Sequence, residues 1–299
     1  MSKYHTPALL HECIEGLAIS DNGTYVDATF GGGGHSKEIL KNIPEGRLIA
    51  FDQDPEAQEN EIEDDRFTLV RQNFKYLKNF LKLHRAIPVD GILADLGISS
   101  HQINTAERGF STRFDGPLDM RMDKSGKLNA ATVVNEYSKE DLTKIFKQYG
   151  EIKNASNLAF QITEHRKLEP IKTTQDLNSI CEKLVQDRKR AKYLAQVYQA
   201  IRIEVNQELE VLKDFLKQCV EVLSKNGRIA IISYHSLEDR IVKTFFKTGN
   251  FDGELNKDFY GNLIRPLNPI NNKIIIPTDE EIERNPRARS ARLRIASLN

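Results

Sequence analysis

The stretch of sequence that decides the fold is Asp27-Ala-Thr-Phe-Gly-Gly-Gly-Gly-His-Ser36. It follows a strand-like run at residues 24–26 and leads into a helix-like run at residues 37–41. Glycines have no Cβ, so a turn made of them lets the backbone and the start of the following helix approach a ligand closely. The stretch therefore predicts a turn that holds a nucleotide-like cofactor.

The chain around this turn alternates between two patterns. Strand-like runs at residues 24–28, 47–51, 67–70 and 91–94 are separated by helix-like runs. This alternation is typical of an α/β domain with a doubly wound, parallel, Rossmann-like sheet. Within it, Asp54-Pro55 has the pattern of a helix N-cap followed by proline at the first helical position.

A helical pattern replaces this alternation between about residues 104 and 206. Apolar side chains recur there at helical spacing, for example at Leu142, Ile145, Phe146 and Tyr149. Strand-like runs return at residues 228–233 and 292–298, on either side of a helix-like run at residues 237–247. We therefore predict a discontinuous α/β domain of residues 1–104 and 206–299, with an all-α domain of residues 105–205 inserted into it.

Composition restricts the possible partners. The 43 basic and 43 acidic residues cancel, so any nucleic-acid contact must use local patches. Two candidate patches are the insertion, with 18 basic and 14 acidic residues, and the tail with Arg284, Arg287, Arg289, Arg292 and Arg294. No apolar run approaches the length of a membrane span, and the three cysteines lack C-x-x-C spacing. We expect a cytoplasmic protein without membrane contact or disulfides, as a monomer or a homodimer.

The spacing within the glycine turn discriminates between cofactors. A dinucleotide turn has the pattern G-x-G-x-x-G, but its third glycine is replaced here by Ser36 or Lys37. The turn instead matches D-x-G-x-G-x-G, the S-adenosylmethionine (SAM) turn of methyltransferases, with Thr29 in place of the first glycine. Asp52 follows the second strand and is the predicted acceptor for the ribose hydroxyls, because Asp54 is already explained as an N-cap.

Asp95 ends the fourth strand and points to the chemistry of the acceptor. A carboxylate at this position faces the crevice where α/β sheets bind ligands. It can accept a hydrogen bond from an exocyclic amine and direct the amine lone pair toward a methyl donor, or it can hold the amino group of SAM. His235, after the fifth strand, is a candidate to accept the released proton, to hold a flipped base or to fix the strand end. The histidines show no metal-ligand spacing, so we predict no essential metal.

Three further groups of side chains have two interpretations each. The backbone N–H of His35 can face the carboxylate of SAM, or His35 simply starts a helix. Phe74 can lie against adenine or belong to the core. In the insertion, aromatic and cationic residues suit stacking and phosphate contacts with single-stranded RNA, namely Phe110, Arg113, Phe114 and Arg121.

Longer motifs give the chain a resemblance to a known family. They include His5-Thr-Pro-Ala-Leu-Leu-His-Glu12, the turn at residues 27–36, Phe51-Asp-Gln-Asp-Pro55, residues 90–102, Glu107-Arg-Gly-Phe-Ser111, Phe114-Asp-Gly-Pro-Leu-Asp-Met-Arg-Met122, residues 199–206, Ser233-Tyr-His-Ser-Leu-Glu-Asp-Arg240 and residues 285–290. Over nearly its whole length the chain resembles the bacterial 16S ribosomal RNA (cytosine-N4)-methyltransferases, the RsmH/MraW family. Departures are small: Ala28 and Gly32 replace residues common in that family, and Tyr234 often appears as Phe.

The resemblance implies a class I SAM methyltransferase fold and N4 methylation of a cytidine in the decoding centre of 16S rRNA, with the helical insertion recognising the substrate. It also implies SAM contacts at Gly33, Gly34, His35, Asp52, Phe74, Asp95 and Gln102. The rival interpretations are a methyltransferase for a protein or small molecule, and an RNA assembly factor that binds SAM without turnover. The sequence does not decide whether naked rRNA, an assembly intermediate or the assembled subunit is the substrate.

Overall fold

A computed structural model describes residues 7–271 and 273–299. His5 and Thr6 of the family motif at residues 5–12 lie outside the described residues. The chain forms two compact units, residues 1–97 with 209–299, and residues 98–208. The helical unit is thus slightly longer at both ends than the predicted insertion of residues 105–205. At its start it also includes the short helix at Ser100–Asn104.

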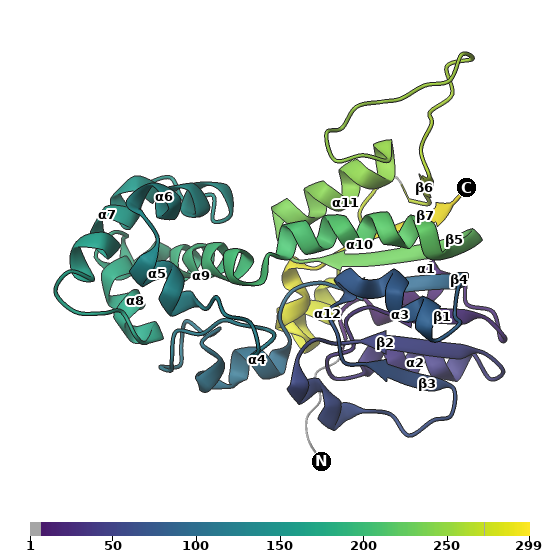
Figure 1. Ribbon diagram of the computed structural model, residues 1–299, viewed down its shortest axis with the longest axis horizontal. Coiled ribbons are helices and arrows are strands. Elements are labelled where there is room, and N and C mark those ends of the chain that lie inside the picture. Colours follow the sequence, from purple (N-terminus) through teal and green to yellow (C-terminus); the bar gives the residue numbers. More distant parts are fainter. Residues whose placement is uncertain (1–6, 272) are drawn as a thin grey trace. The chain divides into compact units, whose positions relative to one another are not determined.

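The first unit is built on one seven-stranded sheet with the order β3-β2-β1-β4-β5-β7-β6 (Figure 1). Its strands are β1 (Thr24–Asp27), β2 (Arg47–Phe51), β3 (Phe67–Val70), β4 (Val89–Asp95), β5 (Leu223–Ser233), β6 (Leu267–Pro269) and β7 (Arg292–Leu298). The first five strands pair in parallel, and β7 pairs antiparallel to both β5 and β6. The predicted Rossmann-like α/β class is confirmed, with an antiparallel edge added to the parallel sheet.

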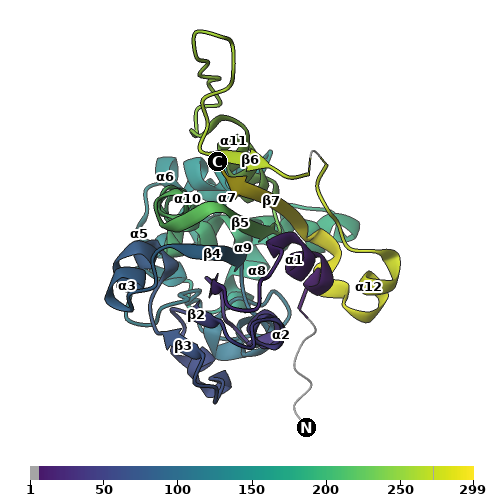
Figure 2. The same cartoon turned by 90° about the vertical axis from the view of Figure 1, so that its right-hand side faces the viewer.

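Helices cover both faces of this sheet (Figures 1 and 2). Alternate strand residues such as Ile49 and Ile92 pack against α3 (Leu77–Leu83), α10 (Glu208–Val222) and α11 (Ser236–Thr248). Their neighbours Leu48 and Leu93 pack on the opposite side, against α1 (Leu10–Leu17) and α2 (Gly34–Asn42). The long apolar runs of the strands follow from this burial on both faces. A short helix, α12 (Asp279–Arg284), precedes β7.

The second unit is helical, and all of its residues are described. It contains α4 (Ser100–Asn104), α5 (Ala130–Glu136), α6 (Lys139–Gln148), α7 (Ala155–His165), α8 (Thr174–Glu182) and α9 (Arg190–Asn206). The predicted stripe on α6 is buried at Leu142, Ile145 and Phe146, where it joins one apolar core with α7, α8 and α9. Ser138 caps α6 and Thr173 caps α8 through their side chains, so these two helices start where an N–H acceptor is available.

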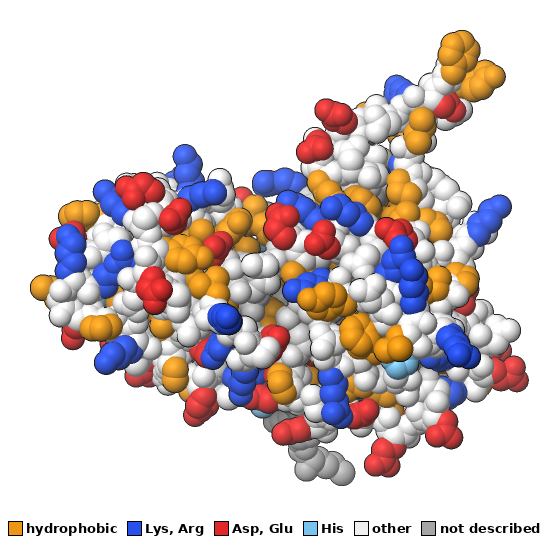
Figure 3. Space-filling model, in the orientation of Figure 1, with side chains coloured by type: hydrophobic (Ala, Val, Ile, Leu, Met, Phe, Trp, Pro, Cys, Tyr) orange, Lys and Arg blue, Asp and Glu red, His pale blue; other side chains and the backbone are white. Residues whose placement is uncertain are grey.

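The surface follows from the balanced composition. Figure 3 shows basic and acidic side chains interspersed over the face in view. Among the described residues, no helix has both the length and the apolar character needed to cross a membrane.

Candidate active site

Four neighbouring parallel strands end at the same edge of the sheet, and polar side chains stand at each end. Asp27 ends β1 and Asp95 ends β4, while Asp52 directly follows β2 and Tyr234 directly follows β5. Strands β1 and β4 are neighbours at the point where the strand order reverses. Ligands of open α/β sheets bind outside the strand ends at such a point. The fold thus brings together residues that are up to two hundred positions apart.

Asp27 fixes the glycine turn from beneath. Its side chain is 1% exposed and accepts hydrogen bonds from the Thr29 backbone N–H (3.1 Å) and the Ser36 hydroxyl (2.7 Å). Burial raises the pKa of the Asp27 carboxyl, and these hydrogen bonds oppose the shift. One carboxylate therefore ties the end of β1 to both ends of the turn.

Thr29 explains why the chain departs from the glycine-only pattern. Its hydroxyl accepts a hydrogen bond from the backbone N–H of Asp95 at 2.6 Å. A glycine at this position would lack that oxygen. The substitution therefore connects the turn after β1 with the end of β4, and it holds the two strand ends in register.

Asp52 contacts the glycine turn directly. Its carboxylate accepts the backbone N–H of Gly31 (2.8 Å) and the N–H of Asp54 (2.8 Å). Burial is the main cause that raises the pKa of Asp52 from 3.8 to about 6, because two hydrogen bonds only partly replace the lost water. Asp54 caps the 3-10 helix at Pro55–Asn60 by accepting the N–H of Glu56 (3.1 Å), which confirms its predicted role.

Two of the glycines are required by the backbone conformation. Gly31 and Gly33 have φ values of +51° and +73°, in the left-handed region that favours glycine. A Cβ on Gly33 would also lie 2.9 Å from the ring of Phe30. Above Gly31 the nearest atom to a Cβ would be 4.0 Å away, which leaves space beside the turn.

Asp95 lies within a small, partly buried network. One carboxylate oxygen accepts a hydrogen bond from the Tyr234 hydroxyl at 2.8 Å, and the other lies 4.0 Å from Nδ1 of His35. Burial raises the pKa of Asp95 to about 6 and also raises that of Tyr234. The network fixes one oxygen of Asp95 and leaves the second, facing His35, available for a hydrogen bond.

His35 lies in the first turn of α2, where backbone N–H groups have no partner within the helix. Its side chain is 5% exposed, and Nε2 is 3.1 Å from the carbonyl oxygen of Ala8, so Nε2 carries the proton. Burial lowers the pKa of His35 and keeps the ring neutral. The unprotonated Nδ1 therefore faces Asp95 across 4.0 Å and donates no hydrogen bond to it.

The other predicted cofactor residues lie in less direct positions. Phe74 is partly buried and packs edge-on against Phe215, with ring centroids 4.9 Å apart. Gln102 forms a reciprocal capping box with Ser99 at the start of α4 and belongs to the second unit. Their contacts with SAM remain predictions.

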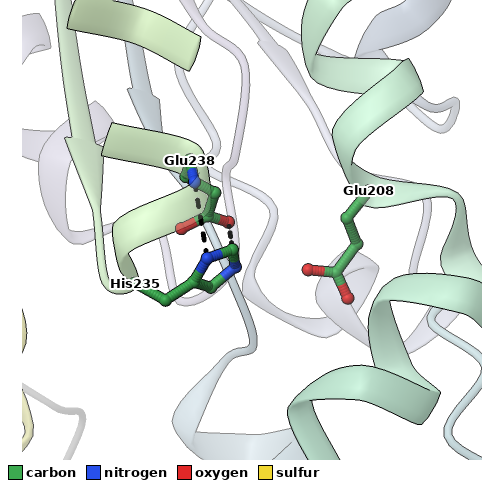
Figure 4. A group of neighbouring side chains, drawn as sticks. All are labelled: Glu208, His235 and Glu238. Carbon is green, nitrogen blue, oxygen red and sulfur yellow. Dashed lines mark hydrogen bonds and ion pairs between the residues drawn. The ribbon is translucent and has the colours of Figure 1, made fainter. Parts of the chain in front are cut away.

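His235 is the N-cap of α11 (Figure 4). Its Nδ1 accepts the backbone N–H of Glu238 (3.4 Å), and its Nε2 lies 3.2 Å from the Glu238 carboxylate. Glu238 in turn accepts the backbone N–H of Tyr234 (3.1 Å). Both ring nitrogens thus face the first turn of the helix, an arrangement that favours fixing the strand end over accepting a proton.

The predicted RNA-contacting residues differ in how far they are exposed and in whether they are already paired. Phe110 is 6% exposed and belongs to the core of the second unit, so its predicted stacking role is wrong. Phe114 is 48% exposed. Arg121 makes two hydrogen bonds to Asp119, at 2.8 and 2.6 Å. In the tail, Arg294 is paired in the same way with Asp239, whereas Arg284, Arg287 and Arg289 are exposed.

Tyr234 is the site residue that the sequence did not reveal. It stood out only as a departure from the family pattern. Its contact with Asp95 depends on β5 lying beside β4, and that strand order is a property of the fold. Once the strand order is known, a tyrosine immediately after β5 indicates that its hydroxyl can reach Asp95 at the end of β4.

A family model described as the MraW methylase family matches residues 2–299. The chain belongs to the MraW methylase family. Ribosomal RNA small subunit methyltransferase H of Flavobacterium johnsoniae is 57% identical, with 98% of this chain and 97% of that protein covered. The protein of the same name from Christiangramia forsetii is 56% identical, with 99% and 98% covered. Among solved structures, an rRNA methylase from Streptococcus thermophilus aligns over 98% of this chain and 97% of its own at 10% identity, with a TM-score of 0.44. Family membership confirms the predicted enzyme class, a SAM-dependent methyltransferase.

Proposed function

We propose that this MraW-family methylase transfers a methyl group from SAM to N4 of a cytidine in the decoding centre of 16S rRNA, within the small ribosomal subunit. The observation that carries the proposal is the Asp95 network at the end of β4, beside the glycine turn. The names of the 56–57% identical relatives support an rRNA substrate of the small subunit.

The polar groups at the carboxyl ends of the strands suit the binding of SAM. When bound, SAM supplies an electrophilic methyl group on a positively charged sulfur. Asp52 and Asp95 are both partly buried carboxylates whose pKa values are raised to about 6 by desolvation. Asp52 accepts two backbone N–H groups and Asp95 accepts the Tyr234 hydroxyl, and a carboxylate can accept further hydrogen bonds. We assign Asp52 to the ribose hydroxyls. The N–H groups of Gly34 and His35 at the start of α2 suit the cofactor carboxylate, and Phe74 suits the adenine. The Gly33 N–H already donates to the Phe30 carbonyl at 2.7 Å, so we assign to Gly33 close approach of the backbone to SAM.

Asp95 is the proposed catalytic residue. The lone pair of a cytosine amine is delocalised into the ring, so the amine is a weak nucleophile. A carboxylate that accepts one amine hydrogen directs the lone pair away from the ring. Transfer would form the N–C bond as the methyl–sulfur bond of the donor breaks and leaves a neutral thioether. The nitrogen would then carry one proton too many, and we assign Asp95 as its acceptor. A carboxylate with a pKa of about 6 is a sufficient base for so acidic a group.

His235 has a supporting role in this proposal. Its Nδ1 accepts a backbone N–H, and its Nε2 faces Glu238. We therefore assign to His235 the fixing of the β5 end, which also carries Tyr234. The proposal also includes the predicted contact of Gln102 with SAM. Gln102 belongs to the second unit, and the other proposed SAM contacts belong to the first.

The RNA-binding surfaces follow from the distribution of charge. We propose that the helical unit, predicted from the sequence as residues 105–205, recognises the rRNA. The exposed arginines Arg284, Arg287 and Arg289 are candidates for phosphate contacts. The target cytosine has to leave its stack, because its amine is out of reach inside a helix. A cytoplasmic location goes with this proposal, since all three cysteines are buried free thiols.

The test is transfer of a labelled methyl group from SAM to small subunits isolated from cells that lack the modification. We expect label in N4-methylcytidine after complete digestion of the rRNA, and a strongly reduced rate of labelling with Asp95→Asn. Label in protein, or in another nucleotide, would overturn the N4-cytidine assignment. Cells in which Asp95→Asn restores every phenotype would instead indicate an assembly factor that binds SAM without needing turnover.

A further inference from the structure

One segment of the first unit projects from the body and is not used by the methyl-transfer site. It connects α11 with β6 (Figures 1 and 2). Lys257 and Leu263 form an antiparallel bridge, and the Ile264 N–H donates to the Asn256 carbonyl at 2.8 Å. We call residues 252–264 the aromatic hairpin.

The tip of the aromatic hairpin is built to hold its shape. The Asp258 carboxylate accepts the backbone N–H groups of Tyr260 (2.9 Å) and Asn262 (2.8 Å) and the Asn262 side-chain amide (3.0 Å). These hydrogen bonds, with the Asn262 side chain contributing most, lower the pKa of Asp258. Gly261, with φ of +87°, closes the turn by donating to the Asp258 carbonyl at 3.0 Å.

This ordered tip presents two aromatic rings to solvent. Phe259 is 97% exposed and Tyr260 is 86% exposed, with ring centroids 5.6 Å apart and planes at 87°. Leu255 and Ile264, lower on the hairpin, are 49% and 59% exposed. Figure 3 shows the resulting apolar tip of the projecting segment. Two neighbouring rings of this size that are exposed together are unfavourable in water, and such a pair marks a binding surface.

The charge of the hairpin discriminates between classes of partner. Residues 251–265 contain two basic side chains, Lys257 and Arg265, against three acidic ones, Asp252, Glu254 and Asp258. Binding to nucleic acid depends on clustered lysines and arginines, as in the arginine-rich tail. An aromatic pair flanked by aliphatic side chains on a nearly neutral support has instead the composition of a protein-interface anchor.

We propose that the aromatic hairpin docks into an apolar pocket on a protein of the small-subunit particle, with Phe259 and Tyr260 as the inserted side chains. This inference rests on the proposed function, because the particle that carries the rRNA substrate supplies the partner. The hairpin thereby makes the enzyme distinguish a particle with bound proteins from protein-free rRNA. Methyl transfer itself does not depend on the hairpin.

The test compares two substrates for one double variant, Phe259→Ala with Tyr260→Ala. Unmodified small subunits and the protein-free 16S rRNA extracted from them are each titrated with wild type, with the double variant, and with Leu83→Ala, a matched exposed apolar residue at the end of α3 (71% exposed). We expect the double variant to raise KM for subunits roughly tenfold or more, the scale of a lost interface hot spot. We expect no change in kcat, in KM for SAM, or in the rate on protein-free rRNA.

Other outcomes overturn the proposal. An equal loss on protein-free rRNA would mean that the rings contact RNA. No loss on subunits would mean that the rings contact nothing there. If wild type sedimented as a dimer and the double variant as a monomer, the partner would be a second copy of this chain.

A crosslink tests the hairpin independently of activity. A photoreactive p-benzoylphenylalanine at position 259 is irradiated with purified subunits, and the adduct is identified by mass. An adduct with a subunit protein supports the proposal, whereas an adduct with rRNA or with a second copy contradicts it. This readout needs no turnover, so it tests the docking of the hairpin even if wild type fails to methylate subunits. Failure to methylate would count against the proposed function alone.

Discussion

Asp95 and Asp64 lie in the same unit, but their surroundings shift their pKa values in opposite directions. At the strand ends, burial raises the pKa of Asp95 to about 6. At the surface turn before β3, hydrogen bonds from Arg66, at 2.9 and 2.6 Å, lower the pKa of Asp64 to about 2. Arg66 also donates to the carbonyls of Leu40 and Ile43 at the end of α2. The first carboxylate is kept short of partners, and the second is fully paired.

This difference separates a carboxylate that serves a ligand from one that serves the fold. A paired surface carboxylate has little capacity left for a substrate. A buried carboxylate with few partners destabilises the folded chain and gains its partners when ligands bind. Substitutions at the two kinds of carboxylate should therefore have different effects on activity and on stability.

Replacing Asp95 with asparagine should remove catalysis. Asparagine keeps the shape and still accepts the Tyr234 hydrogen bond, but it neither carries a negative charge nor takes up a proton. We expect kcat to fall roughly 100- to 1000-fold, the usual cost of losing one electrostatic stabiliser of the transition state. Single-turnover methyl transfer to unmodified subunits measures the effect. Retention of a tenth of the wild-type rate would remove Asp95 from the mechanism.

The same substitution should stabilise the protein. The folded-state pKa of Asp95 lies above its ordinary value of 3.8, so its favourable contribution is complete below pH 3.8 and is lost as pH rises through about 6. Asp95→Asn should therefore exceed wild type in unfolding free energy by up to about 3 kcal/mol above pH 7. Urea unfolding at pH 5 and pH 8 measures this, and the gain should be smaller at pH 5.

Asp64→Asn is the opposing control. The folded-state pKa of Asp64 lies below its ordinary value, so its contribution is present above pH 3.8 and is lost as pH falls through about 2. We expect this variant to be less stable than wild type at neutral pH and fully active. If both variants shifted stability in the same direction, the contrast between the two regions would fail.

Replacing Asp52 with asparagine should weaken the binding of SAM. The variant keeps an oxygen for the Gly31 N–H but loses the charge that strengthens hydrogen bonds from ribose hydroxyls. Hydrogen bonds to a charged group are worth about 1.5–3 kcal/mol, so we expect Kd for SAM to rise roughly 10- to 100-fold. Calorimetric titration measures it, with Asp64→Asn as the unaffected comparison.

Tyr234→Phe should give the smallest effect. Loss of the hydroxyl removes a hydrogen bond that lowers the pKa of Asp95. The acid limb of the rate profile, near pH 6 in wild type, should move to higher pH by about one unit. Rates well above the limb should be unchanged. An unshifted limb with a lower plateau would indicate a role other than tuning Asp95.

The sequence was sufficient for the parts of the site that are local along the chain. The glycine turn, the helix after it and the N-cap role of Asp54 all follow from neighbouring residues. Parallel strands made it predictable that Asp52 and Asp95 share an edge. The contacts of Tyr234 with Asp95, and of Thr29 with the Asp95 backbone, depend on which strands are neighbours, and periodicity does not give that order.

The errors have the same origin. Phe110 was predicted to be available to RNA because aromatic and cationic residues cluster there in sequence, but the core of the second unit takes up its ring. The edge strand β6 was not predicted, because three residues that end in proline carry no strand pattern. Burial in the core decided the position of Phe110, and pairing with the distant β7 made residues 267–269 a strand.

The position of β7 has a consequence for how the enzyme is made. β7 follows β6 along the chain, yet it lies inside the sheet between β5 and β6, and Arg294 on it binds Asp239 at the start of α11. Until β7 is added, β5 is an open edge, and the strand end that carries Tyr234 lacks its neighbour. A nascent chain that has been synthesised only as far as β6 therefore has the whole glycine turn but not the completed edge, and we expect activity only after residues 292–298 have been added.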